Sequence, residues 1–143
     1  MRKRHIIAGL LLILLCAPFI YGSFSNLAYT AEGNANTVSY ETAVKNGKPS
    51  VVLFYANWCT YCRKFMPIFN GLAKNNSGKF NFVKINVDMS GDASISKEYG
   101  ISSLPTVYII EPKYKIKKEV SPYSYSSVRN MQAELDYYLS HRR

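Results

Sequence analysis

The stretch that decides the fold is residues 51–62, which read Val-Val-Leu-Phe-Tyr-Ala-Asn-Trp-Cys-Thr-Tyr-Cys. Its first six residues form an apolar run with no polar alternation, which is typical of a central strand covered on both faces. The Cys59-x-x-Cys62 motif follows where a helix should begin, so we expect the first sulfur at the exposed amino end of that helix and the second one turn inside. The stretch therefore predicts a buried strand that leads directly into a helix carrying two cysteines.

Such a cysteine pair suits thiol–disulfide exchange for a physical reason. The positive end of the helix dipole and the unpaired amides of the first turn stabilise a thiolate on Cys59, and only a thiolate attacks a disulfide. Cys62 lies on the same helical face and could then attack the mixed disulfide and release the substrate. A purely structural disulfide is the alternative, and it is disfavoured because so short a loop restricts the unfolded chain little. A metal-binding pair is disfavoured further.

Helical and strand-like patterns alternate along the rest of the chain. They predict helices over residues 39–44, 59–74, 92–99 and 124–140, strands over 51–56 and 80–87, and a hairpin over 106–110 and 115–120. The last helix is expected to turn one apolar face to the core, made of Val128, Met131, Leu135, Tyr138 and Leu139. This order of elements predicts an α/β domain with a mixed sheet and helices on both faces.

The sequence resembles the thioredoxin family over residues 39–139. The matching blocks are residues 54–59 with Cys62, Pro67 in the following helix, residues 84–88, and residues 99–101 leading to 104–106. The resemblance implies the thioredoxin fold, with a central sheet of four to five strands, and thiol–disulfide oxidoreductase activity with Cys59 and Cys62 as the catalytic pair. It implies no cofactor beyond the redox-active Cys59–Cys62 disulfide.

The resemblance also implies how a substrate would bind. Pro105 would be a cis proline facing the cysteine pair, and the backbone of Leu104 would offer strand-like hydrogen bonds to a substrate chain. Trp58 would shield the sulfurs and meet the substrate, with plain core packing as the alternative. Thr60 and Tyr61 are assigned to the same substrate-binding surface. Tyr123 falls in a loop that the family places beside the site, so a substrate platform there is weighed against a plain surface role.

The chain departs from the family pattern at the position of a buried acid. Leu53 stands where the family has the acid that helps deprotonate the second cysteine, so that proton must leave by another route. Lys84 matches the lysine that accompanies that acid. It could tune the proton or the Cys59 thiolate, or it could simply reach solvent. The Thr60-Tyr61 dipeptide is neither the Gly-Pro of cytosolic thioredoxins nor the Pro-His of periplasmic oxidants, so the family match does not set the redox direction.

The amino-terminal residues have the order of a targeting segment. Three basic residues at positions 2–4 precede an apolar run over residues 6–20, which predicts a signal peptide or an amino-terminal membrane anchor over residues 1–25. Residues 26–36 are expected to be a flexible tether and residues 37–143 the thioredoxin-like domain. The basic end would stay in the cytoplasm, so the domain is expected to be extracytoplasmic, in the periplasm or cell envelope. It would be either soluble after cleavage of the segment or anchored by it. Cys16 lies in the apolar run and is interpreted as a small hydrophobic residue there.

Composition narrows the classes of function. The chain has 143 residues, of which 48% are hydrophobic and 19% charged, which suits one globular domain. With three cysteines and with both histidines near the termini, neither a disulfide-dense scaffold nor a zinc site is expected, and no metal is assigned. The net charge of +9 is spread along the chain without a recognition motif, so nucleic-acid binding is not expected.

These observations favour an exported monomer that exchanges disulfides with protein substrates, as a reductant. The span between residues 86 and 104 is too short for the helical insertion of the Dsb-type oxidants, and no histidine lies near the pair in sequence. An extracytoplasmic reductant needs an electron donor, which predicts a donor protein in the membrane. Disulfide oxidase or isomerase activity is the alternative enzyme function, and a non-catalytic binding module of thioredoxin fold is the alternative from another class.

Overall fold

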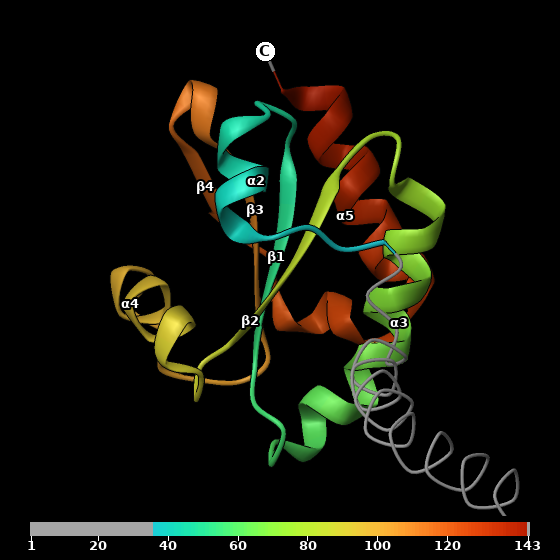
Figure 1. The fold of residues 1–143 in the computed structure, drawn as a ribbon. Helices are drawn as coiled ribbons and strands as arrows, with labels where there is room; N and C mark the ends of the chain where they lie inside the picture. Colours follow the sequence, from blue (N-terminus) through green and yellow to red (C-terminus); the bar gives the residue numbers. More distant parts are fainter. Residues whose placement is uncertain (1–35, 143) are drawn as a thin grey trace, which may run out of the picture. The chain divides into compact units, whose positions relative to one another are not determined.

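The computed structural model describes residues 36–142 (Figure 1). Four helices and four strands follow one another in the order α2 (Tyr40–Lys45), β1 (Ser50–Tyr55), α3 (Thr60–Asn76), β2 (Asn81–Asn86), α4 (Ser90–Glu98), β3 (Thr106–Glu111), β4 (Ile116–Glu119) and α5 (Val128–His141). Short 3-10 helices over Pro112–Tyr114 and Pro122–Ser126 connect the last elements. The predicted leader over 1–25 and the tether up to residue 35 lie outside the described residues.

The sheet is mixed and has the strand order β2-β1-β3-β4. Strand β1 pairs in parallel with β2 and antiparallel with β3, and β4 closes one edge against β3. The parallel pair requires a crossover, which α3 supplies. Because β1 lies inside the sheet and is covered on both faces, Val51 through Phe54 are fully buried, which explains the unbroken apolar run. The predicted α/β architecture is confirmed, with four strands.

Helices cover both faces of this sheet (Figure 1). Under α3 and α5, one apolar cluster joins Leu53 to Phe69 and Leu135. On the opposite face a second cluster joins Val52 and Phe54 to residues of α2 and to Tyr99. Alternate residues of β1 therefore serve two separate cores, and the strand is held from both sides.

The start of the last helix differs from its prediction over residues 124–140. Helix α5 begins only at Val128, because the Ser127 side chain accepts a hydrogen bond from the Asn130 amide at 3.1 Å and caps the helix there. The preceding residues form the separate 3-10 helix instead. Val128, which was expected to face the core, is 41% exposed as the first residue of the helix, whereas Met131, Leu135 and Tyr138 are buried as predicted.

The part of the chain that the structure describes contains no helix both long enough and apolar enough to cross a membrane.

A buried carboxylate ties the end of α5 to the sheet. Glu111 closes β3 and is 4% exposed. The Tyr138 hydroxyl donates a hydrogen bond of 2.6 Å to Glu111 Oε2, and Arg142 Nη1 lies 3.6 Å from Oε1. Burial, and then the hydrogen bond to Glu111, raise the pKa of Tyr138, so it remains a donor at neutral pH. The hydrogen bond from Tyr138 and the ion pair with Arg142 thus offset the loss of hydration that the Glu111 carboxylate suffers on burial.

Replacing Tyr138 with Phe should remove the donor and leave the buried carboxylate short of a partner. We expect the free energy of unfolding to fall by about 1–3 kcal/mol in urea titrations. Tyr137→Phe is the matched control, since its neighbouring ring is 55% exposed and its change should stay within about 0.5 kcal/mol. Equal losses in the two variants would contradict a stabilising role for the Tyr138–Glu111 bond.

Candidate active site

The cysteine pair sits where β1 ends and α3 begins. Cys59 is the N-cap residue of α3, and its sulfur accepts a hydrogen bond of 3.1 Å from the Cys62 amide. The two residues are joined by a disulfide, with their Cα atoms 5.2 Å apart. The amide that points at Cys59 Sγ is one of the helix's unpaired first-turn donors, so it would also stabilise a negative charge on that sulfur after reduction.

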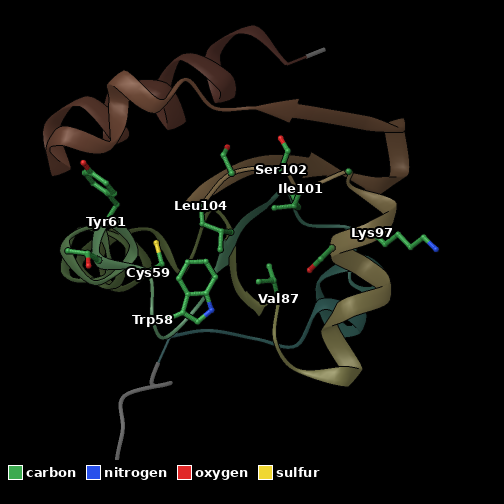
Figure 2. Close-up of a pocket in the computed structure, with 12 residues that line it drawn as sticks. Trp58, Cys59, Tyr61, Val87, Lys97, Ile101, Ser102 and Leu104 are labelled. Atoms are coloured by element: carbon green, nitrogen blue, oxygen red, sulfur yellow. The ribbon is translucent and has the colours of Figure 1, made fainter.

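The two sulfurs lie in different surroundings. Cys62 is 1% exposed and faces a hollow lined by Tyr55, Met66 and Pro67, which we call the Cys62 hollow. Cys59 is 5% exposed, so with the disulfide formed it is less open to solvent than the sequence suggested. The reason is that Ala56 and Leu104 pack around it. Its sulfur nevertheless points into a larger hollow, which Cys59 lines and Cys62 does not (Figure 2).

This larger hollow, of about 730 Å³, lies between Trp58 and the segment that follows α4, and we call it the Trp58 hollow. The indole of Trp58 flanks Cys59, with Val87 and Leu104 on the other sides (Figure 2). Trp58 and Tyr61 are 68% and 72% exposed. Thr60 lines the same hollow. Large aromatic surface left open beside a reactive sulfur is what a protein partner would cover.

A further hollow of about 550 Å³ lies on the other side of Leu104, and we call it the Pro105 hollow. The Leu104–Pro105 peptide bond is cis, as the resemblance implies. Tyr61, Ser103 and Leu104 line both this hollow and the Trp58 hollow. The two hollows therefore form one groove that passes the cysteine pair.

Tyr125 is a residue of this groove that the sequence did not single out. Its ring lies 4.8 Å from that of Phe65 between centroids and lines the Pro105 hollow. Its hydroxyl accepts a hydrogen bond from the Val107 amide at 2.8 Å and donates one to the Val120 carbonyl at 3.1 Å. Burial chiefly raises the pKa of Tyr125 to about 12, so the hydroxyl stays protonated. Recognising the Ser127 cap in the sequence would have placed Tyr125 in a loop beside the site.

Tyr123, the residue weighed as a substrate platform, is placed differently. It is 90% exposed and is not among the residues that line either part of the groove.

The region of the missing acid is apolar. Leu53 is fully buried, and Lys84 lies beside it as its register partner on β2. Lys84 is half-buried, and desolvation lowers the pKa of its ammonium. Among the described residues no carboxylate forms an ion pair with Lys84. Tyr55, two residues after Leu53 on the same strand, lines the Cys62 hollow, and burial followed by the charge of Asp92 raises its pKa.

Within residues 36–142 no group of three His, Cys, Asp or Glu side chains lies close enough together to hold a metal ion.

Comparison with known proteins assigns the family. The family model described as Thioredoxin matches residues 32–133 of this chain. The chain belongs to the thioredoxin family. Members of this family are thiol–disulfide oxidoreductases, and their fold is the one described above.

Relatives of this thioredoxin-family chain come from several kinds of organism. The chloroplastic thioredoxin-like protein HCF164 of Arabidopsis thaliana is 39% identical over 71 residues, which are 50% of this chain and 27% of that protein. The thioredoxin of Borreliella burgdorferi is 36% identical over 80 residues, which are 56% of this chain and 67% of that protein. The chain spans less than a third of the length of several relatives that it matches.

Solved structures agree on the fold. The J-Trx1 fragment of ERdj5 superposes with a TM-score of 0.63 at 18% identity, covering 73% of this chain and 50% of that one. Oxidised thioredoxin O2 of Arabidopsis thaliana superposes with a TM-score of 0.56 at 20% identity, covering 72% and 94%.

Leu53→Asp would restore a carboxyl to this thioredoxin-family site. The change should cost about 3–5 kcal/mol of unfolding free energy, because it removes a core leucine and buries a polar group. It should also speed the attack of Cys62 on a mixed disulfide by at least about tenfold near neutral pH, as a general base would. Single-turnover kinetics with a mixed-disulfide substrate measure that step.

The control is Leu53→Asn, which introduces a side chain of nearly the same shape that accepts no proton. Burial raises the pKa of a carboxyl, so the acceleration in the Leu53→Asp variant should be present above that raised pKa and disappear as the pH falls through it. A Leu53→Asp variant that stays folded and resolves no faster than the Leu53→Asn variant would show that water or Lys84 already removes the Cys62 proton.

Proposed function

We propose that this protein is an extracytoplasmic thiol–disulfide oxidoreductase that reduces disulfides of protein substrates through Cys59 and Cys62. The observation that carries the proposal is the position of Cys59. Its sulfur caps α3, accepts a hydrogen bond from the Cys62 amide, and points into the groove that also contains cis Pro105. Once reduced, a sulfur held at a helix amino end and bordering a groove would act as a nucleophile, whereas a purely structural disulfide needs neither feature.

The reaction takes two exchanges. In the reduced protein the Cys59 thiolate attacks one sulfur of the substrate disulfide, forming a mixed disulfide while the other substrate sulfur leaves as a thiolate. Cys62 then loses its proton and attacks Cys59 Sγ, which breaks the mixed disulfide and releases the second substrate thiolate. The substrate gains two electrons, and Cys59 and Cys62 become the disulfide. Because Cys62 is buried in an apolar setting, loss of its proton is the step that Leu53 should slow.

The groove residues have distinct parts in this proposal. Trp58, Thr60 and Tyr61 would contact the substrate on the side of Cys59, while the backbone of Leu104 and the ring of Pro105 would align an extended substrate chain across the sulfurs. Lys84 would tune the proton or thiolate chemistry from the neighbouring strand, since its lowered pKa leaves it closer to a proton acceptor at neutral pH than an ordinary lysine.

The proposed direction of electron flow rests on the absence of a histidine next to the cysteine pair in the described sequence. The reduction potentials of strong disulfide oxidants and of thioredoxin differ by about 150 mV, or roughly 7 kcal/mol. The oxidant has the higher potential because its reduced form is stabilised. Within residues 36–142 the one histidine is His141 at the end of α5, so no imidazolium adjoins Cys59 in sequence to supply such stabilisation. Oxidase or isomerase activity remains the second candidate, because the same pair and groove serve either direction.

The cellular setting is part of the proposal. The basic and then apolar order of residues 1–25 supports export, with the domain soluble after cleavage or anchored by that segment. A reductant on the outer side of a membrane would receive electrons from a membrane donor protein. We propose a monomer with protein thiols and disulfides as its partners and no nucleic acid among them.

The trapping experiment tests the order of the two cysteines. Replacing Cys62 with Ser should leave Cys59 able to attack and unable to be released, so mixed disulfides with client proteins should accumulate on non-reducing gels. Replacing Cys59 with Ser should give none, although both variants lose one sulfur. Trapping through Cys62 alone would reverse the assignment. Absence of insulin reduction above the chemical reductant by the unaltered protein would instead favour a binding module.

A reporter fused after Asn36 should be active only if it is of the kind that works outside the cytoplasm. Mass measurement of the native protein then separates the two forms, because an intact amino terminus in the membrane fraction means an anchor and a shortened one means cleavage. Activity of a cytoplasmic-type reporter would contradict export.

A further inference from the structure

Each of the three hollows around the disulfide carries one charged side chain, and each of these is a cation. Lys97 lines the Trp58 hollow, Lys64 the Pro105 hollow and Arg63 the Cys62 hollow. All three residues are exposed. The remaining lining residues are apolar or neutral, so the face that meets a partner carries positive charge at separate points around an apolar centre.

Arg63 is fixed in position beside the cysteines. Its Nη1 donates to the Asn57 carbonyl and its Nη2 to Thr60 Oγ1, both at 3.1 Å. These two bonds hold the guanidinium against the active-site loop, and they leave further donors of its planar fork for a partner. A cation that is already ordered loses little side-chain entropy when it binds an anion.

Lys64 and Lys97 stand at the two ends of the groove. Lys64 Nζ lies 5.8 Å from the centroid of the Tyr61 ring, which keeps the ammonium near the Pro105 hollow. The Lys97 stem borders the Trp58 hollow, and Figure 2 shows its ammonium directed outward from the rim. From there it would meet residues farther along a bound chain than those next to the sulfurs.

The first residues of helix α3 also favour positive charge near the cysteine pair. The first turn of α3 contains no acidic residue, although carboxylates there would stabilise the helix, and cations follow immediately at positions 63 and 64. The carboxylates next in sequence to lining residues are Asp88, which is exposed and follows Val87, and Glu98, which follows Lys97. Three cations therefore line the three hollows, and no carboxylate is among their lining residues.

We infer that the groove selects protein partners whose cysteine lies beside apolar residues and is flanked on both sides by Asp or Glu. The inference rests on the proposed function and adds its substrate class. Apolar residues next to the cysteine would fill the two parts of the groove, and carboxylates a few residues away would meet Lys64 at one end and Lys97 at the other. Charges at the rim act mainly on the rate of encounter, so the preference should depend strongly on salt.

The experiment uses three peptides of equal length with the same internal disulfide and the same apolar neighbours, flanked by Glu, Ser or Lys. The reduced full chain, in non-ionic detergent, reacts with each peptide in a stopped-flow instrument, and Trp58, the one tryptophan of the chain, reports the reaction. Each rate constant is divided by that of the same peptide with dithiothreitol, which also attacks as a singly charged thiolate, so differences in intrinsic reactivity cancel. We expect the Glu peptide to react roughly tenfold faster than the Lys peptide at low salt, and the ratio to approach one at about 1 M salt.

Charge reversal locates the effect. The double variant Lys64→Glu, Lys97→Glu should invert the order of the Glu and Lys peptides. The control Lys74→Glu, Lys79→Glu changes the net charge equally at the other end of the sheet, where α3 ends and β2 begins, and should keep the order.

A low-salt ratio near one, or an equal change in the control variant, would overturn the inference while reduction of the Ser peptide still upheld the proposed function. Failure of the unaltered protein to reduce the Ser peptide would overturn the proposed function and this inference with it.

Discussion

The hydrogen bond from the Cys62 amide to Cys59 Sγ is the contact on which the site depends. It exists because the chain leaves the buried strand β1 after Tyr55 and enters α3 at Thr60, which makes Cys59 the N-cap residue of the helix. A cap of serine or aspartate would satisfy the same amide, but a sulfur there could also be held as a reactive thiolate after reduction, as the proposed function requires. The Cys62 amide would thus both cap the helix and stabilise the Cys59 thiolate.

The pair is asymmetric because its two members line different hollows. Cys59 borders the groove, whereas Cys62 lies inward beside Tyr55 and close to an apolar strand. Leu53 is an apolar side chain that is buried at little cost but accepts no proton. Its register partner Lys84 therefore lacks the acidic neighbour that the family pattern would supply. In the proposed mechanism, an attacking Cys59 held by the Cys62 amide would therefore work with a resolving Cys62 that has few proton acceptors around it.

Most of the fold was predictable because its signals are local. The apolar run of β1, the two cysteines three residues apart and Pro105 each decide their own conformation, and together they fix a known arrangement. The beginning of α5 was not predicted, since Ser121, Ser124, Ser126 and Ser127 all lie in one short segment and any could cap a helix. Tyr125 was missed for the same reason. The burial of Cys59 was also missed, because Leu104 reaches it from a distant part of the chain.

The double hydrogen bond of the Tyr125 hydroxyl has a consequence for how partners are accommodated. It links the Val107 amide, two residues after Pro105, to the Val120 carbonyl that follows β4, so a displacement of the Tyr125 ring would break bonds to two segments at once. The conformational entropy of the Tyr125 side chain is lost when the chain folds, before any partner arrives. Under the proposed function, a substrate would therefore have to supply the flexibility, and unfolded or loop segments should be accepted more readily than rigid surfaces.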